Sequence, residues 1–318
     1  MFERFANQWT PVLPIRDITS NPLATELAGE RLVLFSDGSR WHALLDHCPH
    51  RGARLSLGAV TDGGHLRCPY HGWQFDGAGA CTQIPLNSVN AAGMARAAAT
   101  ALPTREIAGC VWVYTGTAAP HEPQLPAALT DPDGGYVTYT QEWQAHWTRA
   151  VENFVDFAHP PYLHERTIGA WSRPFADSGG QAYIDIEPTD FGMTVMNYFG
   201  SRRHGFRLEW HRPNMSVLHF GQSAANRLHV FSIPLNEQRT RVMNLRWIPA
   251  GSNAAAASQQ AGQVDHPILD EDRVIVESQS GDVLSDPREV SVGTDQPSLV
   301  FRRYYAELLA SGERTGEP

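Results

Sequence analysis

The chain has 318 residues, which suits one large or two ordinary domains, and its 42% hydrophobic content is enough for well-packed cores. Its formal net charge of −9 gives no electrostatic reason to expect binding to nucleic acid or to an anionic membrane. No stretch approaches the roughly twenty apolar residues of a membrane-spanning helix, and the first residues lack the apolar core of a signal peptide. Four Cys in a chain of this length do not indicate a disulfide scaffold, so we expect a cytoplasmic protein.

The first third of the chain has the pattern of β-structure. Between residues 9 and 116, short runs rich in Val, Leu, Trp and Tyr occur, for example at 31–35, 41–45 and 111–114. Clusters of Gly, Pro and Asp separate these runs and supply turn residues at close intervals. This spacing predicts a small antiparallel barrel or sandwich.

Two Cys/His couples fall where these strands pass into loops. They read Cys48-Pro-His50-Arg-Gly and Cys68-Pro-Tyr-His71-Gly-Trp. Two thiolates and two imidazoles can hold either one zinc ion or a [2Fe–2S] cluster in which two His bind one of the irons. The ligand types alone therefore leave a structural zinc site and an electron-transfer cluster both open.

The residues around the couples resemble the Rieske [2Fe–2S] signature of ring-hydroxylating oxygenases. All four ligand positions match, and the Arg-Gly and Gly-Trp contexts favour the cluster over a zinc module. The resemblance implies that Cys48 and Cys68 bind one iron while His50 and His71 bind the other. Imidazoles in place of two thiolates make such a cluster less negative and raise its reduction potential.

A loop rich in Pro and Gly follows between residues 117 and 135. A segment with many Pro and Gly residues and no hydrophobic periodicity is typical of a linker. We therefore predict a boundary here, with one domain at residues 1–118 and a second at 119–318.

The segment 147–164 begins the second domain with a helical pattern. Asn153, Asp156 and His159 recur every three residues and so lie along one side of a helix. Pro160 disfavours helical geometry at the residue before it, so the helix is predicted to end near His159. A kink at this point allows His159 and His164 to reach the same ion.

A carboxylate would complete the two-His-one-carboxylate triad of non-haem iron sites. A helix predicted to begin near Pro267 carries three consecutive acids, of which only Asp272 shares an apolar stripe; Asp270 and Glu271 are expected to face solvent. An acid on an apolar stripe should be paired or bound to a metal. From the pattern alone, the partner of Asp272 is about equally a metal ion or a basic residue such as Arg273.

The order Asn-x-x-Asp-x-x-His-x4-His, then Glu-Asp-x-x-Ile-x-Glu-x-Gln, resembles the catalytic domain of Rieske non-haem iron oxygenases. The resemblance implies that His159, His164 and Asp272 bind a mononuclear Fe(II). It also implies that Asp156 links a Rieske His to an iron-binding His, and that Asn153 is a polar residue near the iron.

The expected fold class is α+β, with an all-β Rieske domain followed by a catalytic domain of the helix-grip type. Strand-like segments occupy residues 181–248, and helices on one face of an antiparallel sheet suit this fold. Residues 249–265 are rich in Ala and Gln and are expected to form a flexible loop. The last helix is predicted to start at Gln296-Pro297, since Pro is favoured at the first helical position.

The resemblance implies a terminal oxygenase that uses O2 and electrons from NAD(P)H. A separate flavin reductase or ferredoxin would deliver them, because the chain has no nucleotide-binding glycine motif. It further implies a homotrimer in which Asp156 joins His71 of one subunit to His159 of the next. The expected reaction is hydroxylation or oxidative demethylation of a cyclic or aromatic small molecule. The alternatives are ring cis-dihydroxylation, a Rieske electron carrier without oxygenase activity, and a zinc-stabilised binding module.

Overall fold

The computed structural model describes residues 2, 5–116, 120–130, 135–201, 205–220, 227–249, 251 and 253–311. The chain forms two compact units, Met1–Pro123 and Gln124–Gly312. The predicted boundary between residues 118 and 119 lies outside the described residues. Within the described part, no helix is long and apolar enough to cross a membrane.

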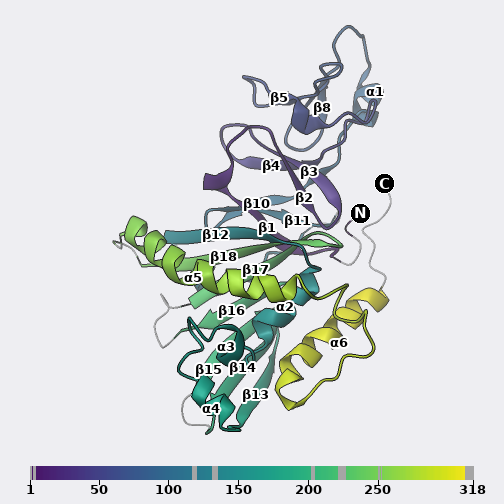
Figure 1. Ribbon diagram of the computed structural model, residues 1–318. Helices are drawn as coiled ribbons and strands as arrows, with labels where there is room; N and C mark the ends of the chain where they lie inside the picture. The colour runs from purple at the N-terminus through teal and green to yellow at the C-terminus, as the bar shows by residue number, and fades with distance from the viewer. Residues whose placement is uncertain are drawn as a thin grey trace. The chain divides into compact units, whose positions relative to one another are not determined.

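The first unit consists of three antiparallel sheets, as the all-β prediction requires (Figure 1). Their strand orders are β1-β11-β10, β2-β3-β4-β9 and β5-β6-β7-β8. The strands are β1 (Trp9–Pro14), β2 (Leu23–Leu27), β3 (Glu30–Ser36), β4 (Trp41–Leu45), β5 (Ala59–Val60), β6 (Leu66–Arg67), β7 (Gln74–Phe75), β8 (Cys81–Gln83), β9 (Ala101–Leu102), β10 (Thr104–Ile107) and β11 (Cys110–Tyr114), with one short helix, α1 (Ala91–Arg96). Cys48 and Cys68 belong to a buried core cluster that also contains Leu66 and Phe75.

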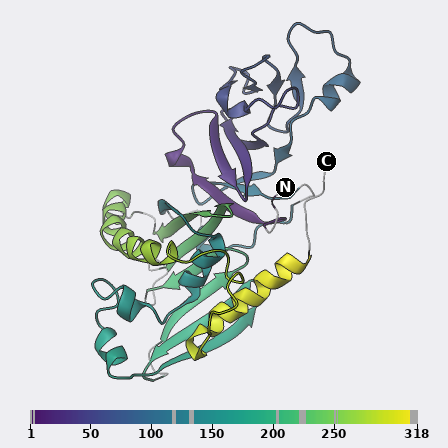
Figure 2. The same ribbon diagram turned by 45° about the vertical axis from the view of Figure 1, so that its right-hand side comes forward.

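The second unit is built on a seven-stranded antiparallel sheet with the order β12-β18-β17-β16-β15-β14-β13. Its strands are β12 (Gly135–Trp143), β13 (Ala182–Thr189), β14 (Gly192–Phe199), β15 (Gly205–His211), β16 (Met215–His219), β17 (Arg227–Asn236) and β18 (Arg239–Ile248). Its helices are α2 (Trp147–Val155), α3 (Pro160–Leu163), α4 (Arg173–Asp177), α5 (Ala254–Val276) and α6 (Gln296–Ser311). Figures 1 and 2 show α2, α5 and α6 against one face of this sheet, which confirms the predicted α+β architecture.

The core of the second unit lies between this sheet and its helices. Phe154 on α2 and Leu269 on α5 are buried together with Leu228, Val230 and Val242 of the central strands. Burial of such side chains is the main favourable contribution to folding. This packing fixes α2 over strands β15 to β18 and α5 at the β12 edge of the sheet, and these two helices carry the candidate iron ligands or lead into them.

The first helix of this unit ends earlier than predicted, at Val155 rather than near His159. Asp156 has extended backbone angles, φ −79° and ψ 144°, and its carboxylate accepts hydrogen bonds from the backbone N–H groups of Ala158 and His159. Asp side chains that bind nearby N–H groups compete with helical hydrogen bonding. The helix break therefore comes from Asp156, and Pro160 instead begins the short helix α3.

The prediction of a flexible loop over residues 249–265 is wrong. Helix α5 starts at Ala254 and carries Pro267 in its interior, not at its start. Asn253 caps it, because the Asn253 side chain accepts a hydrogen bond from the N–H of Ala256. Ala and Gln are strong helix formers, so a segment that looked like low-complexity loop extends the helix instead. The start of α6 at Gln296 agrees with the sequence prediction.

Candidate functional site

The Cys/His couples sit in two loops of equivalent shape, one after β4 and one after β6. In the first loop the N–H of Gly52 donates to the carbonyl of Cys48 at 2.9 Å, and in the second Gly72 donates to Cys68 at 3.1 Å. Both glycines have positive φ angles, +72° and +71°, which other residues adopt only with strain. The repeated Cys-Pro element, with Gly four residues after each Cys, thus produces two matching turns, each presenting one thiol and one imidazole.

The four side chains of these loops fit an iron–sulfur cluster. The rings of His50 and His71 lie with their centroids 4.6 Å apart, and His50 stacks on Trp73 at 4.5 Å. Cys48 and Cys68 are both buried, and burial raises the pKa of the Cys48 thiol to about 11 in the absence of metal. Nδ1 of His50 is buried without a hydrogen-bond partner. A buried thiol of this kind ionises when a metal cation binds it, so this donor set suits the cluster.

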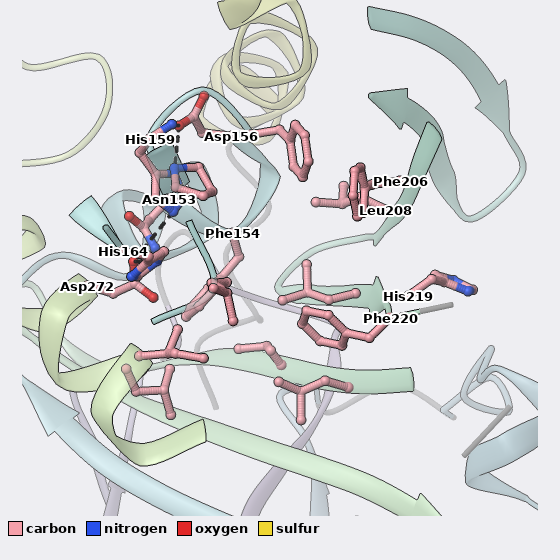
Figure 3. A pocket seen from close by; sticks show the side chains of 18 of the residues that line it. Asn153, Phe154, Asp156, His159, His164, Phe206, Leu208, His219, Phe220 and Asp272 are labelled. Atoms are coloured by element: carbon pink, nitrogen blue, oxygen red, sulfur yellow. Dashed lines mark hydrogen bonds and ion pairs between the residues drawn. The ribbon is translucent and has the colours of Figure 1, made fainter. Parts of the chain in front are cut away.

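A second donor set lies in the other unit. Single ligand atoms of His159, His164 and Asp272 lie within 4.8 Å of one another, and Figure 3 shows the three side chains together on one side of a pocket. Oδ1 of Asp272 is 3.2 Å from Nε2 of His164 and 3.6 Å from Nε2 of His159. Neither contact has hydrogen-bond geometry, so this buried oxygen has no hydrogen-bond partner. A cation bound between the three side chains would satisfy it.

Each imidazole of this second set has a carboxylate at its other ring nitrogen. Nδ1 of His159 lies 2.7 Å from Asp156, and Nδ1 of His164 lies 2.7 Å from Glu271. Burial alone would raise the pKa of Asp156, but its hydrogen bonds, above all from His159, lower this pKa below the usual range. A carboxylate at Nδ1 fixes the proton there and leaves Nε2 free to bind a metal. The arrangement therefore prepares both imidazoles as metal ligands.

Glu271 is the functional residue that helical periodicity did not identify, since that pattern assigned it to solvent. Its carboxylate binds His164 and also accepts a hydrogen bond from the Thr167 hydroxyl at 2.9 Å. The segment that follows α3 packs against the side of α5 that carries Glu271. Helical periodicity shows which residues share a side of a helix but not which other segment packs against that side. Asp270 agrees with the prediction, because its side chain is 53% exposed, and it pairs with Arg273. Arg273 is therefore the partner of Asp270 rather than of Asp272.

Replacement of Glu271 by Ala is expected to weaken binding of the mononuclear iron by roughly 10- to 100-fold, the usual effect of losing a partner of a metal-binding His. Glu271→Gln should recover part of the affinity, because its amide oxygen can still accept from Nδ1 of His164. Competition with an iron chelator measures this affinity. Asp270→Ala is the matched control, since it removes the neighbouring exposed carboxylate. Equal iron affinity in the Glu271→Ala variant and in this control would contradict the role of Glu271.

The donor set opens into a cavity between the helices and the sheet. Figure 3 shows Phe206, Leu208 and Phe220 across the cavity from His159 and His164, with Phe154 between the two sides. Asn153 lines the same cavity from α2, and its Nδ2 is buried without a hydrogen-bond partner. The middle of the cavity wall is apolar and includes Phe154, Leu208, Leu218, Leu228, Val230, Ile268 and Leu269. Such a wall suits a compact, largely apolar organic molecule.

Two protein families match the chain. Residues 8–97 match the Rieske [2Fe-2S] domain, and residues 143–311 match the vanillate O-demethylase oxygenase C-terminal domain. The second match alone spans more than half of the chain. The first contains both Cys/His couples, and the second contains His159, His164 and Asp272.

Individual relatives match either nearly all of the chain or about half of it. The chain is 27% identical to the methylxanthine N1-demethylase NdmA of Pseudomonas putida, over 94% of this chain and 88% of that protein. The structure of NdmB from Pseudomonas putida CBB5 superposes with a TM-score of 0.79 at 26% identity, covering 98% of this chain and 92% of that one. Pheophorbide a oxygenase of Oryza sativa subsp. japonica is 33% identical over 52% of this chain, but the match spans only 34% of that longer protein.

Proposed function

Because this chain belongs to the Rieske non-haem iron oxygenases, with a [2Fe–2S] cluster and a mononuclear iron, we propose that it removes a methyl group oxidatively from a small cyclic molecule. Hydroxylation of the same class of molecule is the closest alternative. The observation that carries the proposal is the set of three ligand atoms within 4.8 Å of one another on the wall of a largely apolar cavity. The match to an O-demethylase domain and the N1-demethylase relative support removal of a methyl group.

The residues divide between the two metal centres. In the proposal, Cys48 and Cys68 hold one iron of the cluster, and His50 and His71 hold the other. The mononuclear iron is held by His159, His164 and Asp272. When bound, this iron supplies the site at which O2 is activated, since three protein ligands leave coordination positions open. Asp156 and Glu271 orient the two imidazoles, and Asn153 offers an amide donor beside the site.

The overall reaction consumes two electrons that come from outside this protein. O2, two electrons, two protons and the methylated substrate give the demethylated product, formaldehyde and water. A C–H bond of the methyl group is oxidised, and the bond from this carbon to the ether oxygen on the ring, or to the ring nitrogen, breaks. Electrons reach the family's oxygenases from a reductase or ferredoxin, here proposed to draw on NAD(P)H. The apolar cavity wall limits the access of water to the reacting carbon.

The assembly is part of the same proposal. We assign residues 1–118 to the Rieske domain and 119–318 to the catalytic domain, and we expect a cytoplasmic homotrimer. A closed head-to-tail ring places the cluster of one subunit beside the mononuclear iron of the next. Support comes from Asp156, which binds Nδ1 of His159 through Oδ2, while its Oδ1 accepts from the N–H of Ala158 and keeps a second lone pair for His71 of a neighbouring subunit.

The test is a reconstitution of the iron-loaded protein with a flavin reductase, NADH and a panel of methoxy- and N-methyl-substituted aromatic rings. We expect O2 consumption that depends on substrate, with one formaldehyde released per product. Product that retains its methyl group and gains one hydroxyl would favour hydroxylation, and a cis-dihydrodiol would favour the dioxygenase alternative. Reduction and reoxidation of the cluster without any product would identify an electron carrier and overturn the proposal.

A further inference from the structure

The cavity wall contains two buried amides that the iron site does not use. Asn197 on β14 is 1% exposed and Asn244 on β18 is 3% exposed, and both line the cavity. Neither the nitrogen nor the oxygen of either side chain has a hydrogen-bond partner in the described part of the chain. Buried amides are nearly always hydrogen-bonded, because leaving them unpaired lowers the stability of the fold. Their presence on a cavity wall therefore points to a bound molecule as the missing partner.

Asn244 lies in the neighbourhood of the iron site. It is opposite Val230 in the register of β17 and β18, and Val230 packs in one cluster with Phe154 and Leu269. Leu269 precedes Asp272 by one turn of α5. Asn244 thus borders the apolar middle of the cavity, on the side reached by α5.

Asp265 gives this part of the cavity a second polar group. It lines the cavity from α5, two helical turns before Asp272, which corresponds to about 10 Å along the helix axis. Both of its oxygens accept from one nitrogen of Arg246, at 2.9 and 3.0 Å, and Arg246 is on the same face of β18 as Asn244. The cavity therefore has a polar end formed by Asn244 and Asp265 at one side and the candidate iron ligands at the other.

The charges around this polar end select against anions. Arg246 is engaged by Asp265. Apart from the candidate iron ligands His159 and His164, the basic side chains among the described lining residues are Arg207 and His219, and both are engaged by Glu209, at 3.0 and 3.1 Å. A substrate carboxylate at the polar end would thus meet Asp265 without a free cation among the described lining residues. A carboxamide, in contrast, donates and accepts equally well. Its best complement is a ring carbonyl next to a ring N–H.

We propose that Asn244 is a specificity-determining residue that binds the amide edge of a neutral nitrogen heterocycle. The ring N–H would donate to Asp265, whose oxygens each keep a lone pair beyond the hydrogen bond from Arg246. This inference rests on the proposed function. Demethylation requires the methyl group to lie at the iron, and the opposite edge of the ring then contacts Asn244. The separation of Asp265 and Asp272 suits a bicyclic ring that carries a methyl substituent at its far end.

Three probes of one shape test the proposal: a methoxyquinolinone, a methoxynaphthalene and a methoxynaphthoate, each with the methoxy group at the end opposite the variable edge. Their affinities are measured by anaerobic calorimetry on the iron-loaded protein without reductase, so that binding is separated from turnover. The quinolinone is expected to bind about tenfold more tightly than the naphthalene, the effect of one or two satisfied hydrogen bonds. The naphthoate is expected to bind most weakly.

Asn244→Leu is expected to lower the affinity for the quinolinone about tenfold and to leave that for the naphthalene unchanged or higher. The thermal midpoint of the ligand-free protein should not fall, because Leu replaces an unpaired amide by an apolar group of similar volume. If this variant does not fold, Asn244→Ala allows the same comparison.

Asn197→Leu is the matched control, since it makes the same change at the other amide of the described cavity wall whose nitrogen and oxygen both lack a hydrogen-bond partner. Three strands separate β14 from β18, so at about 4.8 Å per strand the two amides are roughly 19 Å apart across the sheet. The control should keep the wild-type ratio of quinolinone to naphthalene affinity. The proposal is overturned if Asn244→Leu also keeps that ratio, if both variants lose it equally, or if the wild type prefers the naphthoate.

The same probes separate this inference from the proposed reaction. Selective binding of the quinolinone that depends on Asn244, without formaldehyde release, would support the inference and reject demethylation. Formaldehyde release from all three probes, with an unchanged affinity ratio in Asn244→Leu, would support demethylation and reject the inference.

Discussion

Asp272→Ala is expected to remove the mononuclear iron and to abolish turnover, while the [2Fe–2S] cluster keeps its full content of iron and sulfide. Asp272 supplies the only carboxylate of the candidate ligand set, and its Oδ1 lies within 3.6 Å of both imidazoles. Two neutral imidazoles cannot replace the charge of this ligand, so affinity for Fe(II) should fall by at least about 100-fold.

Metal analysis together with the visible spectrum of the cluster distinguishes the two centres. Asp270→Ala serves as the control, because it removes the exposed acid on the same turn of α5 and should keep both metals. An Asp272→Ala protein that retains one mononuclear iron per chain would show that the iron lies elsewhere.

Asp156→Asn is expected to keep both metal centres but to reduce turnover by about 100-fold or more. The N–H groups of Ala158 and His159 bind different oxygens of Asp156, so the single Asn oxygen can keep one of these two hydrogen bonds and hold the backbone turn in part. The charged partner of Nδ1 of His159 is lost, however, and with it the proposed carboxylate link between His159 and His71 of the neighbouring subunit. Both changes affect the transfer of an electron to the iron and not the binding of substrate.

Stopped-flow reoxidation of the reduced cluster is the informative measurement. In the Asp156→Asn variant, substrate and O2 should reoxidise the cluster far more slowly than in the wild type, at equal iron content. Normal reoxidation and turnover would reject the bridge, and loss of the mononuclear iron would show that Asp156 acts on metal binding instead.

The parts of the site that could be predicted from sequence are those encoded by near neighbours in the chain. The Cys/His couples are short motifs whose Gly residues shape their own loops, so spacing alone grouped them. Asp272 could be selected because an acid on an apolar helical stripe needs a partner. The structure brings Asp272 to His159 and His164, although more than a hundred residues separate them.

The parts that could not be predicted depend on what covers a surface. Glu271 faces away from the apolar stripe of α5. The segment carrying Thr167 lies over it, however, and Glu271 becomes a half-buried partner of His164 instead of a solvated side chain. Asn197 and Asn244 lie on strands whose central residues are buried on both faces, so alternation did not mark them as cavity residues. Helix ends were missed where a single side chain decided them, Asp156 for α2 and Asn253 for α5.

Because Oδ1 of Asp272 has no hydrogen-bond partner, the stability of the folded protein should depend on the supply of iron in the cell. A buried carboxylate oxygen without a hydrogen-bond partner, close to two imidazoles but not bonded to either, lowers the stability of the folded chain until a cation binds it. Iron that binds only the folded state then adds to its stability, by about 2.7 kcal/mol when free iron is 100 times the dissociation constant. The protein made during iron starvation would therefore be less resistant to proteolysis as well as inactive, and its abundance would follow the availability of the metal without any change in gene expression.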